Sequence, residues 1–126
     1  MFKSLLIGAA CCAFSLTALA QENLVGKWGG SWRSNIGGVD RQIGLELEIT
    51  SVEGNIVRST MNNMSNRGCN GVFPVVGKLN GNELGMIATE AGGAQRDCKP
   101  GFRATIDGTK MTGKYASQYD MTLNKK

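Results

Sequence analysis

Apolar and polar residues alternate along this chain with a period of two. The alternation is clearest over Arg41 to Ser51, where isoleucine or leucine occupies every second position from 43 to 49 and the intervening positions are polar or glycine. A β-strand with one face in a core and the other in water produces this pattern, whereas a helix would scatter these residues around its circumference. Gly26 to Ser34 repeats the pattern, with Trp28 and Trp32 on one face.

Turn signals divide the rest of the chain into short segments of the same kind. Glu53-Gly54-Asn55 ends the second strand, and Asn80-Gly81 and Asp107-Gly108 are strong hairpin signals because both residues of each pair tolerate positive φ. The predicted strands are residues 26–34, 41–51, 56–61, 72–79, 83–89, 102–106 and 110–115, and a last strand that contains Tyr119, Met121 and Leu123.

Eight short strands joined in sequence predict an all-β fold. We expect a small antiparallel up-and-down β-barrel, because closure removes the exposed strand edges that invite aggregation. A two-sheet β-sandwich is the alternative, but the tight local hairpins favour up-and-down order over the crossovers of a Greek key. Glycines inside the predicted strands, at positions 44, 77, 85 and 113, fit the sharp curvature of a narrow barrel.

The first twenty residues have the order of a secretory signal peptide. One positive charge at Lys3 precedes an uncharged, mostly apolar run, and Ala18-Leu19-Ala20 supplies the small residues that a signal peptidase recognises. The apolar run is shorter than the roughly 20 residues of a membrane span, and neither Cys11 nor Cys12 follows a typical lipoprotein sequence. We therefore expect residues 1–20 to be removed, and residues 21–126 to form one domain in the periplasm or the medium.

Signal removal leaves two cysteines, Cys69 and Cys98. An even pair in an exported domain predicts one disulfide bond, and closing a loop of about 30 residues should stabilise the fold by roughly 3 to 4 kcal/mol. A metal site is the rival interpretation, but it lacks ligands because the sequence contains no histidine. We expect neither a metal nor a cofactor.

The same composition argues against an enzyme. Without histidine there is no Ser-His or Cys-His nucleophile, and both remaining cysteines are expected to be oxidised. Glu46 and Glu48 share a strand face, but it is the polar face, where carboxylates keep a barrel soluble. The expected domain has a net charge near +3, without a run of Lys and Arg, so nucleic acid is not an expected partner.

The connections differ in length between the two ends of the expected barrel. The tight turns fall at one end, and the other end carries Ser34–Asp40, Asn62–Gly71 and Glu90–Gly101, which we call the rim. A disulfide would tie two of these loops together, and loops carry function more often than their scaffold does. The rim is basic and rich in asparagine, which suits an anion or a sugar. The candidate binding residues are Trp32, Arg41, Asn62, Arg67, Arg96 and Lys99.

The segment Gly26-Lys27-Trp28, at the start of the first predicted strand, resembles the G-x-W opening of calycins, the superfamily of lipocalin- and avidin-like barrels. The resemblance implies that Trp28 plugs the closed end of a barrel that binds a small ligand. It is limited to this opening: the T-D-Y segment and the terminal helix of lipocalins have no counterpart, nor do the ligand-stacking tryptophans of avidins.

The sequence therefore predicts an exported, non-enzymatic binding protein that takes a small anion or a glycan at the rim. The alternative is a protein–protein module, such as a secreted hydrolase inhibitor. A small-ligand pocket requires an interior with room, whereas a protein-binding module works with a barrel that side chains fill.

Overall fold

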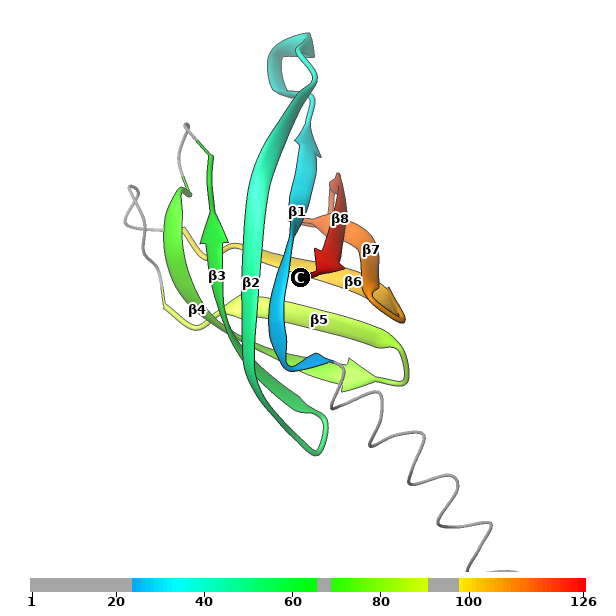
Figure 1. Cartoon of the computed structure of the whole chain (residues 1–126). Coiled ribbons are helices and arrows are strands. Elements are labelled where there is room, and N and C mark those ends of the chain that lie inside the picture. The colour runs from blue at the N-terminus through cyan, green and yellow to red at the C-terminus, as the bar shows by residue number, and fades with distance from the viewer. Residues whose placement is uncertain (1–23, 66–68, 91–97) are drawn as a thin grey trace, which may run out of the picture.

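The eight predicted strands form a closed antiparallel β-barrel in the computed structural model, which describes residues 24–65, 69–90 and 98–126 (Figure 1). The predicted signal peptide and the arginines at 67 and 96 lie outside these residues. The strands are β1 Gly26–Ser34, β2 Arg41–Glu53, β3 Ile56–Asn63, β4 Gly71–Asn80, β5 Glu83–Ala88, β6 Gly101–Asp107, β7 Lys110–Tyr115 and β8 Tyr119–Lys125. One short 3-10 helix, Ile36–Gly38, interrupts the β1–β2 connection.

The strand order confirms the up-and-down barrel and not the sandwich. Each strand pairs with the next one in sequence, and β8 returns to pair with β1, so that Trp32 faces Met121 in register. In Figure 1, β1, β2 and β3 run lengthwise, and β5 and β6 cross behind them. The chain therefore closes without a free strand edge among the described residues.

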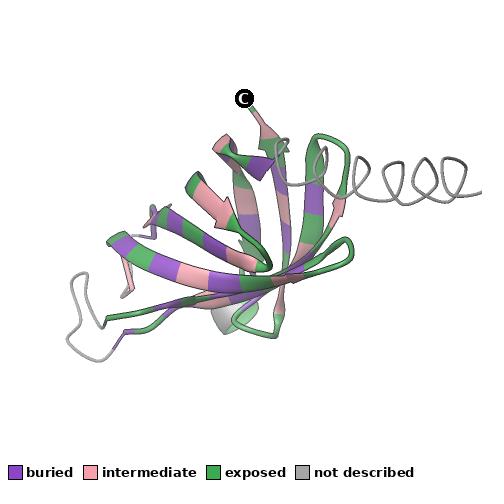
Figure 2. Cartoon of the chain, turned by 90° about the horizontal axis from the view of Figure 1, so that it is seen from below, coloured by how far each residue is buried: buried purple, intermediate pink, exposed green. Residues whose placement is uncertain are grey.

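Side chains fill the inside of the barrel. Buried and exposed residues alternate along every strand (Figure 2). Trp28, Leu45, Met61 and Phe73 have no measurable exposure, because alternate residues of every strand project into the same narrow interior.

At the tight-turn end, backbone hydrogen bonds join each turn to the strand that follows its hairpin. The carbonyl groups of Asn55, Asn82 and Thr109 each accept a hydrogen bond from a strand of the next hairpin, at 2.7–2.8 Å. Glycine occupies the first central position of all three turns, with φ of 60–63°, as in type II′ hairpins. Asn80 and Asp107 end their strands and are not central turn residues, which corrects the type I′ assignment implied by the sequence.

The strand glycines divide into two groups. A Cβ atom at Gly77 or Gly113 would lie 2.1 or 1.8 Å from a carbonyl oxygen of the neighbouring strand, and Gly30 is equally crowded. Only glycine lets these backbones approach so closely. Gly44 and Gly85, by contrast, would contact only flexible side chains. Gly44 and Gly85 face outward, so close approach of a neighbouring backbone does not explain glycine at these two positions.

Cys69 and Cys98 form the predicted disulfide bond. Their Cα atoms are 5.4 Å apart, a normal separation for bridged cysteines. Cys69 precedes β4 and Cys98 precedes β6, so the bridge joins the two longest connections at the end of the barrel opposite the tight turns. The rim is therefore covalently anchored.

Candidate functional site: the rim and the outer groove

Beneath the rim, Trp32 packs inside the barrel against two tyrosines. It is 6% exposed, its ring stacks on Tyr115 with the centroids 4.4 Å apart, and the ring of Tyr119 lies 5.1 Å away. Stacked aromatic pairs of this kind add stability beyond the area that they bury. Trp32, which the sequence left undecided between core and ligand contact, is a core residue in this structure.

Asn63 links this aromatic cluster to the disulfide loop. Trp32 Nε1 donates a hydrogen bond to Asn63 Oδ1 at 3.0 Å, and Asn63 Nδ2 donates to the Cys69 carbonyl at 2.7 Å and to the Tyr115 hydroxyl at 3.1 Å. Asn63 itself is 1% exposed. We call Trp32, Asn63 and Tyr115 the mouth network. It satisfies a buried amide whose desolvation would otherwise be costly.

Burial in the mouth network also shifts the ionisation of Tyr115. Removal from water raises the pKa of the Tyr115 hydroxyl to about 12, and the hydrogen bond from Asn63 opposes this shift. Desolvation disfavours the phenolate because an anion loses more hydration energy than a neutral hydroxyl. At neutral pH the hydroxyl is protonated and acts as the acceptor for Asn63.

The candidate Asn62 does not belong to the mouth network. The sequence placed it in the loop that begins at position 62, but β3 continues to Asn63. Along β3 the inward positions are Val57, Ser59, Met61 and Asn63. Asn62 therefore lies on the outer wall, half-buried and opposite Val72. The signal for this was present in the sequence, because a strand that buries Met61 also buries the residue two positions later.

The described cations of the rim are exposed. Arg41 opens β2, opposite Ser34 in register, and Lys99 follows Cys98 directly. Neither has an ion-pair partner among the described residues, whereas Arg33 donates a hydrogen bond to Asp40 at 2.7 Å. The Asp40 carboxylate raises the pKa of Arg33 further. Trp32, Arg41, Asn62 and Lys99 thus occupy four separate surroundings and form no single cluster.

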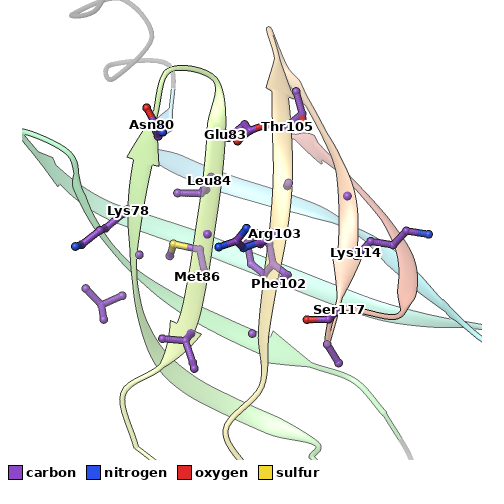
Figure 3. A pocket seen from close by; sticks show the side chains of 18 of the residues that line it. Lys78, Asn80, Glu83, Leu84, Met86, Phe102, Arg103, Thr105, Lys114 and Ser117 are labelled. Atoms are coloured by element: carbon purple, nitrogen blue, oxygen red, sulfur yellow. The ribbon is translucent and has the colours of Figure 1, made fainter.

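A second feature, absent from the sequence prediction, lies on the outside of the wall formed by β4 to β7. The described residues line a groove of about 1200 Å³ there (Figure 3). Leu84, Met86 and Phe102 border it, but their side chains belong to the core and are at most 4% exposed. Gly85 carries no side chain in the middle of this surface, and Arg103 projects toward it: a Cβ at Gly85 would lie 3.9 Å from Arg103 Cγ. We call this feature the outer groove.

Register orders the outer groove into rows that cross the strands. Lys78 pairs with Gly85, Gly85 with Arg103, and Arg103 with Lys114. The next row is apolar, with Val76 opposite Ile87, and Ile87 is 56% exposed. The row on the other side is polar and consists of Asn80, Glu83, Thr105 and Thr112.

The basic row of the outer groove is partly neutralised at one end. Lys114 forms an ion pair with Asp120 of β8, and the hydrogen bond from Lys114 lowers the pKa of that carboxyl. Lys78 and Arg103 have no ion-pair partner among the described residues. Of the candidates that the structure describes (Trp32, Arg41, Asn62 and Lys99), only Lys99 lines the groove.

The described residues offer no metal centre and no membrane helix. They contain no group of three His, Cys, Asp or Glu side chains placed to hold a metal ion. Among them, no helix is both long and apolar enough to cross a bilayer.

The chain has no significant match to a protein-family model, to a curated protein or to a solved structure.

Proposed function

We propose that this chain is an exported, non-enzymatic binding protein that holds an anionic ligand on its rim. The ligand carries carboxylate, phosphate or sulfate groups, either as a free small anion or as part of a glycan. The calycin-like opening is part of this proposal: Trp28, which is fully buried and donates a hydrogen bond to the Leu24 carbonyl at 2.8 Å, fits the expected plug of the closed end.

One observation carries the proposal: the barrel is filled directly beneath the rim. Each side-chain N and O atom of the mouth network takes part in a hydrogen bond within the network or to the Cys69 carbonyl, and no described side chain has a buried polar atom without a partner. Binding inside the barrel would have to break these contacts. A ligand on the surface leaves them intact and meets loops whose bases are already fixed, which reduces the entropy lost on binding.

The charges of the rim favour an anionic ligand. Arg41 and Lys99 are exposed cations without ion-pair partners among the described residues, so an approaching anion need not displace an existing carboxylate. Arginine can hold a carboxylate or phosphate with two parallel hydrogen bonds. Arg67 and Arg96 remain candidates from the sequence for the same role.

A chemical-shift titration tests this proposal. Isotope-labelled protein is titrated separately with inorganic phosphate, citrate, a uronic-acid tetrasaccharide and a neutral tetrasaccharide. We expect saturable shifts at residues 35–41 and 98–100 with at least one anionic probe. Arg41→Ala with Lys99→Ala should weaken that binding about tenfold, or 1.4 kcal/mol. Arg67→Ala and Arg96→Ala, measured separately, test the two remaining arginines.

The control is Lys27→Ala with Lys110→Ala, which removes the same charge from exposed strand positions away from the rim. Its affinity should stay within twofold of the parent. The comparison of phosphate and citrate with the uronic-acid probe distinguishes a free anion from a glycan. Shifts confined to the tight-turn end, or no response to any anionic probe, would contradict the proposal.

A further inference from the structure

The basic side chains of the outer groove are aligned, and alignment is not needed if they serve only to keep the surface soluble. Lys78, Arg103 and Lys114 come from three different strands, yet register places them in one line across the wall. Exposed lysines and arginines normally solvate a surface without order. Here they border an apolar pair, the half-buried Val76 and the exposed Ile87, and a hollow above Gly85.

We propose that the outer groove docks an acidic amphipathic helix of a partner protein. The acidic residues of the helix would face the basic row, and its aliphatic residues would cover Val76 and Ile87. This is a second site on the outer wall, and it does not depend on the rim site. If this chain binds another protein, the outer groove would be the binding surface.

The spacing of the rows favours a helix over an extended segment. Neighbouring strands lie about 4.8 Å apart, and helix side chains three or four positions apart are separated by about 5–6 Å. A helix lying across the strands therefore meets successive strands with successive turns. In an extended chain lying in the same direction, side chains on one face are about 6.6–6.8 Å apart, which does not match the spacing of the strands.

Closure of the barrel excludes the commonest way of binding an extended peptide. Strand addition needs a sheet edge with unpaired backbone groups, and every strand of this barrel pairs with a neighbour on both sides. A partner at this wall must therefore bind through side chains, which is how helices bind in grooves.

Charge and composition argue against other occupants. A second copy of this chain placed face to face would bring the basic rows together. The predicted signal segment, residues 1–20, contains no Asp or Glu to pair with that row. A glycan would lack an aromatic ring to stack on, because the outward-facing residues among those that line the described groove are aliphatic, polar or charged.

A designed peptide tests the groove directly. The probe is a capped 18-residue helix with glutamates in one stripe and leucines in the adjoining stripe, and the control peptide has the same composition with both stripes scrambled. In a chemical-shift titration of the labelled protein, we expect the striped peptide to shift Lys78, Gly85, Ile87 and Arg103. The scrambled peptide should bind at least tenfold more weakly.

Two variants separate groove binding from a general charge effect. Lys78→Glu with Arg103→Glu should weaken binding at least tenfold, whereas Lys27→Glu with Lys110→Glu, with the same change in net charge, should stay within twofold. Gly85→Val should weaken binding of the striped peptide as much as Lys78→Glu with Arg103→Glu does, because the valine fills the hollow. The melting temperature should stay equal or rise, because valine suits an exposed strand position.

The remaining outcomes would overturn the proposal. They are equal binding of the scrambled peptide, peptide shifts confined to the rim, unchanged binding by Gly85→Val, or a groove that binds the uronic-acid tetrasaccharide and not the peptide. A dimer in sedimentation experiments that Lys78→Glu disrupts would assign the groove to self-association. Lys99 lines the outer groove as well as the rim, whereas Arg41 does not line the groove. Arg41→Ala measured alone for the rim, and Lys78→Glu with Arg103→Glu for the groove, therefore allow either proposal to fail alone.

Discussion

The inner and outer faces of the β4–β7 wall differ in how much space they leave for a side chain at their glycines. On the inner face, glycine at 77 and 113 is required because a Cβ would collide with a neighbouring carbonyl. On the outer face, glycine at 85 has room for a side chain and leaves a hollow. The inner face is thus constrained by packing, whereas the outer face is free to vary and nevertheless carries an ordered row of cations. This difference directs attention to the outer face as a binding surface.

The largest expected difference between the two faces is the change in unfolding free energy when an inner or an outer glycine is replaced by alanine. Gly113→Ala places a methyl group 1.8 Å from the Arg103 carbonyl oxygen. We expect it to lower the free energy of unfolding by roughly 3 kcal/mol, at the upper end of overpacking costs. Gly85→Ala should raise it by about 0.5 kcal/mol, because alanine loses less backbone entropy on folding than glycine. Urea unfolding measures both, and equal effects would refute the division of the glycines.

Asn63, which points into the barrel, and Asn62, which lies on the outer wall, should also differ in their effect on stability. Asn63→Ala removes the partner of Trp32 Nε1 and the amide that reaches the Cys69 carbonyl. Leaving these buried groups unpaired should cost about 2 kcal/mol of unfolding free energy. Asn62→Ala, on the outer wall, should change it by less than about 0.5 kcal/mol. Chemical denaturation of both variants checks the expectation, which fails if Asn62 proves to be the costlier position.

The smallest expected effect is a pH dependence that comes from the mouth network. An unfolded tyrosine ionises near pH 10, whereas burial raises the pKa of folded Tyr115 to about 12. Between these values the unfolded state releases its proton first, so the stability contributed by Tyr115 is complete below pH 10 and is lost as the pH rises toward 12.

Tyr115→Phe isolates this contribution from the lysines, which titrate in the same range. The stability advantage of the parent over Tyr115→Phe should shrink between pH 9 and pH 11.5 in urea unfolding experiments. An absorbance titration of tyrosinate should also lose its highest-pH component in the variant. A constant difference between the two proteins would show that Tyr115 ionises normally.

Most of the fold could be predicted from the sequence, because its causes are local. Period-two alternation specifies strands wherever one face is buried, and it located β1 and β7 to the residue. Gly54, Gly81 and Gly108 marked the tight turns because few other residues adopt positive φ. The parity of the cysteines that remain after the expected signal removal was enough to predict the bridge between Cys69 and Cys98.

The site was less predictable, because its causes are not local. Whether β3 ends before or after Asn62 decides which asparagine points inward, and the pairing of Asn62 and Asn63 with Val72 and Gly71 of β4 settles that. Trp32 became a core residue only because Tyr115 and Tyr119, more than 80 positions later, close over it.

The alternation, the turn glycines and the two cysteines thus determined the strands, the up-and-down barrel and the disulfide of this protein. Only the tertiary structure decided which glycines are crowded and which cations stand together. Lys78, Arg103 and Lys114 are far apart in the sequence. They form a row because the registers of the strand pairs β4–β5, β5–β6 and β6–β7 align them. Register depends on the pairing of whole strands, and no single segment contains that information.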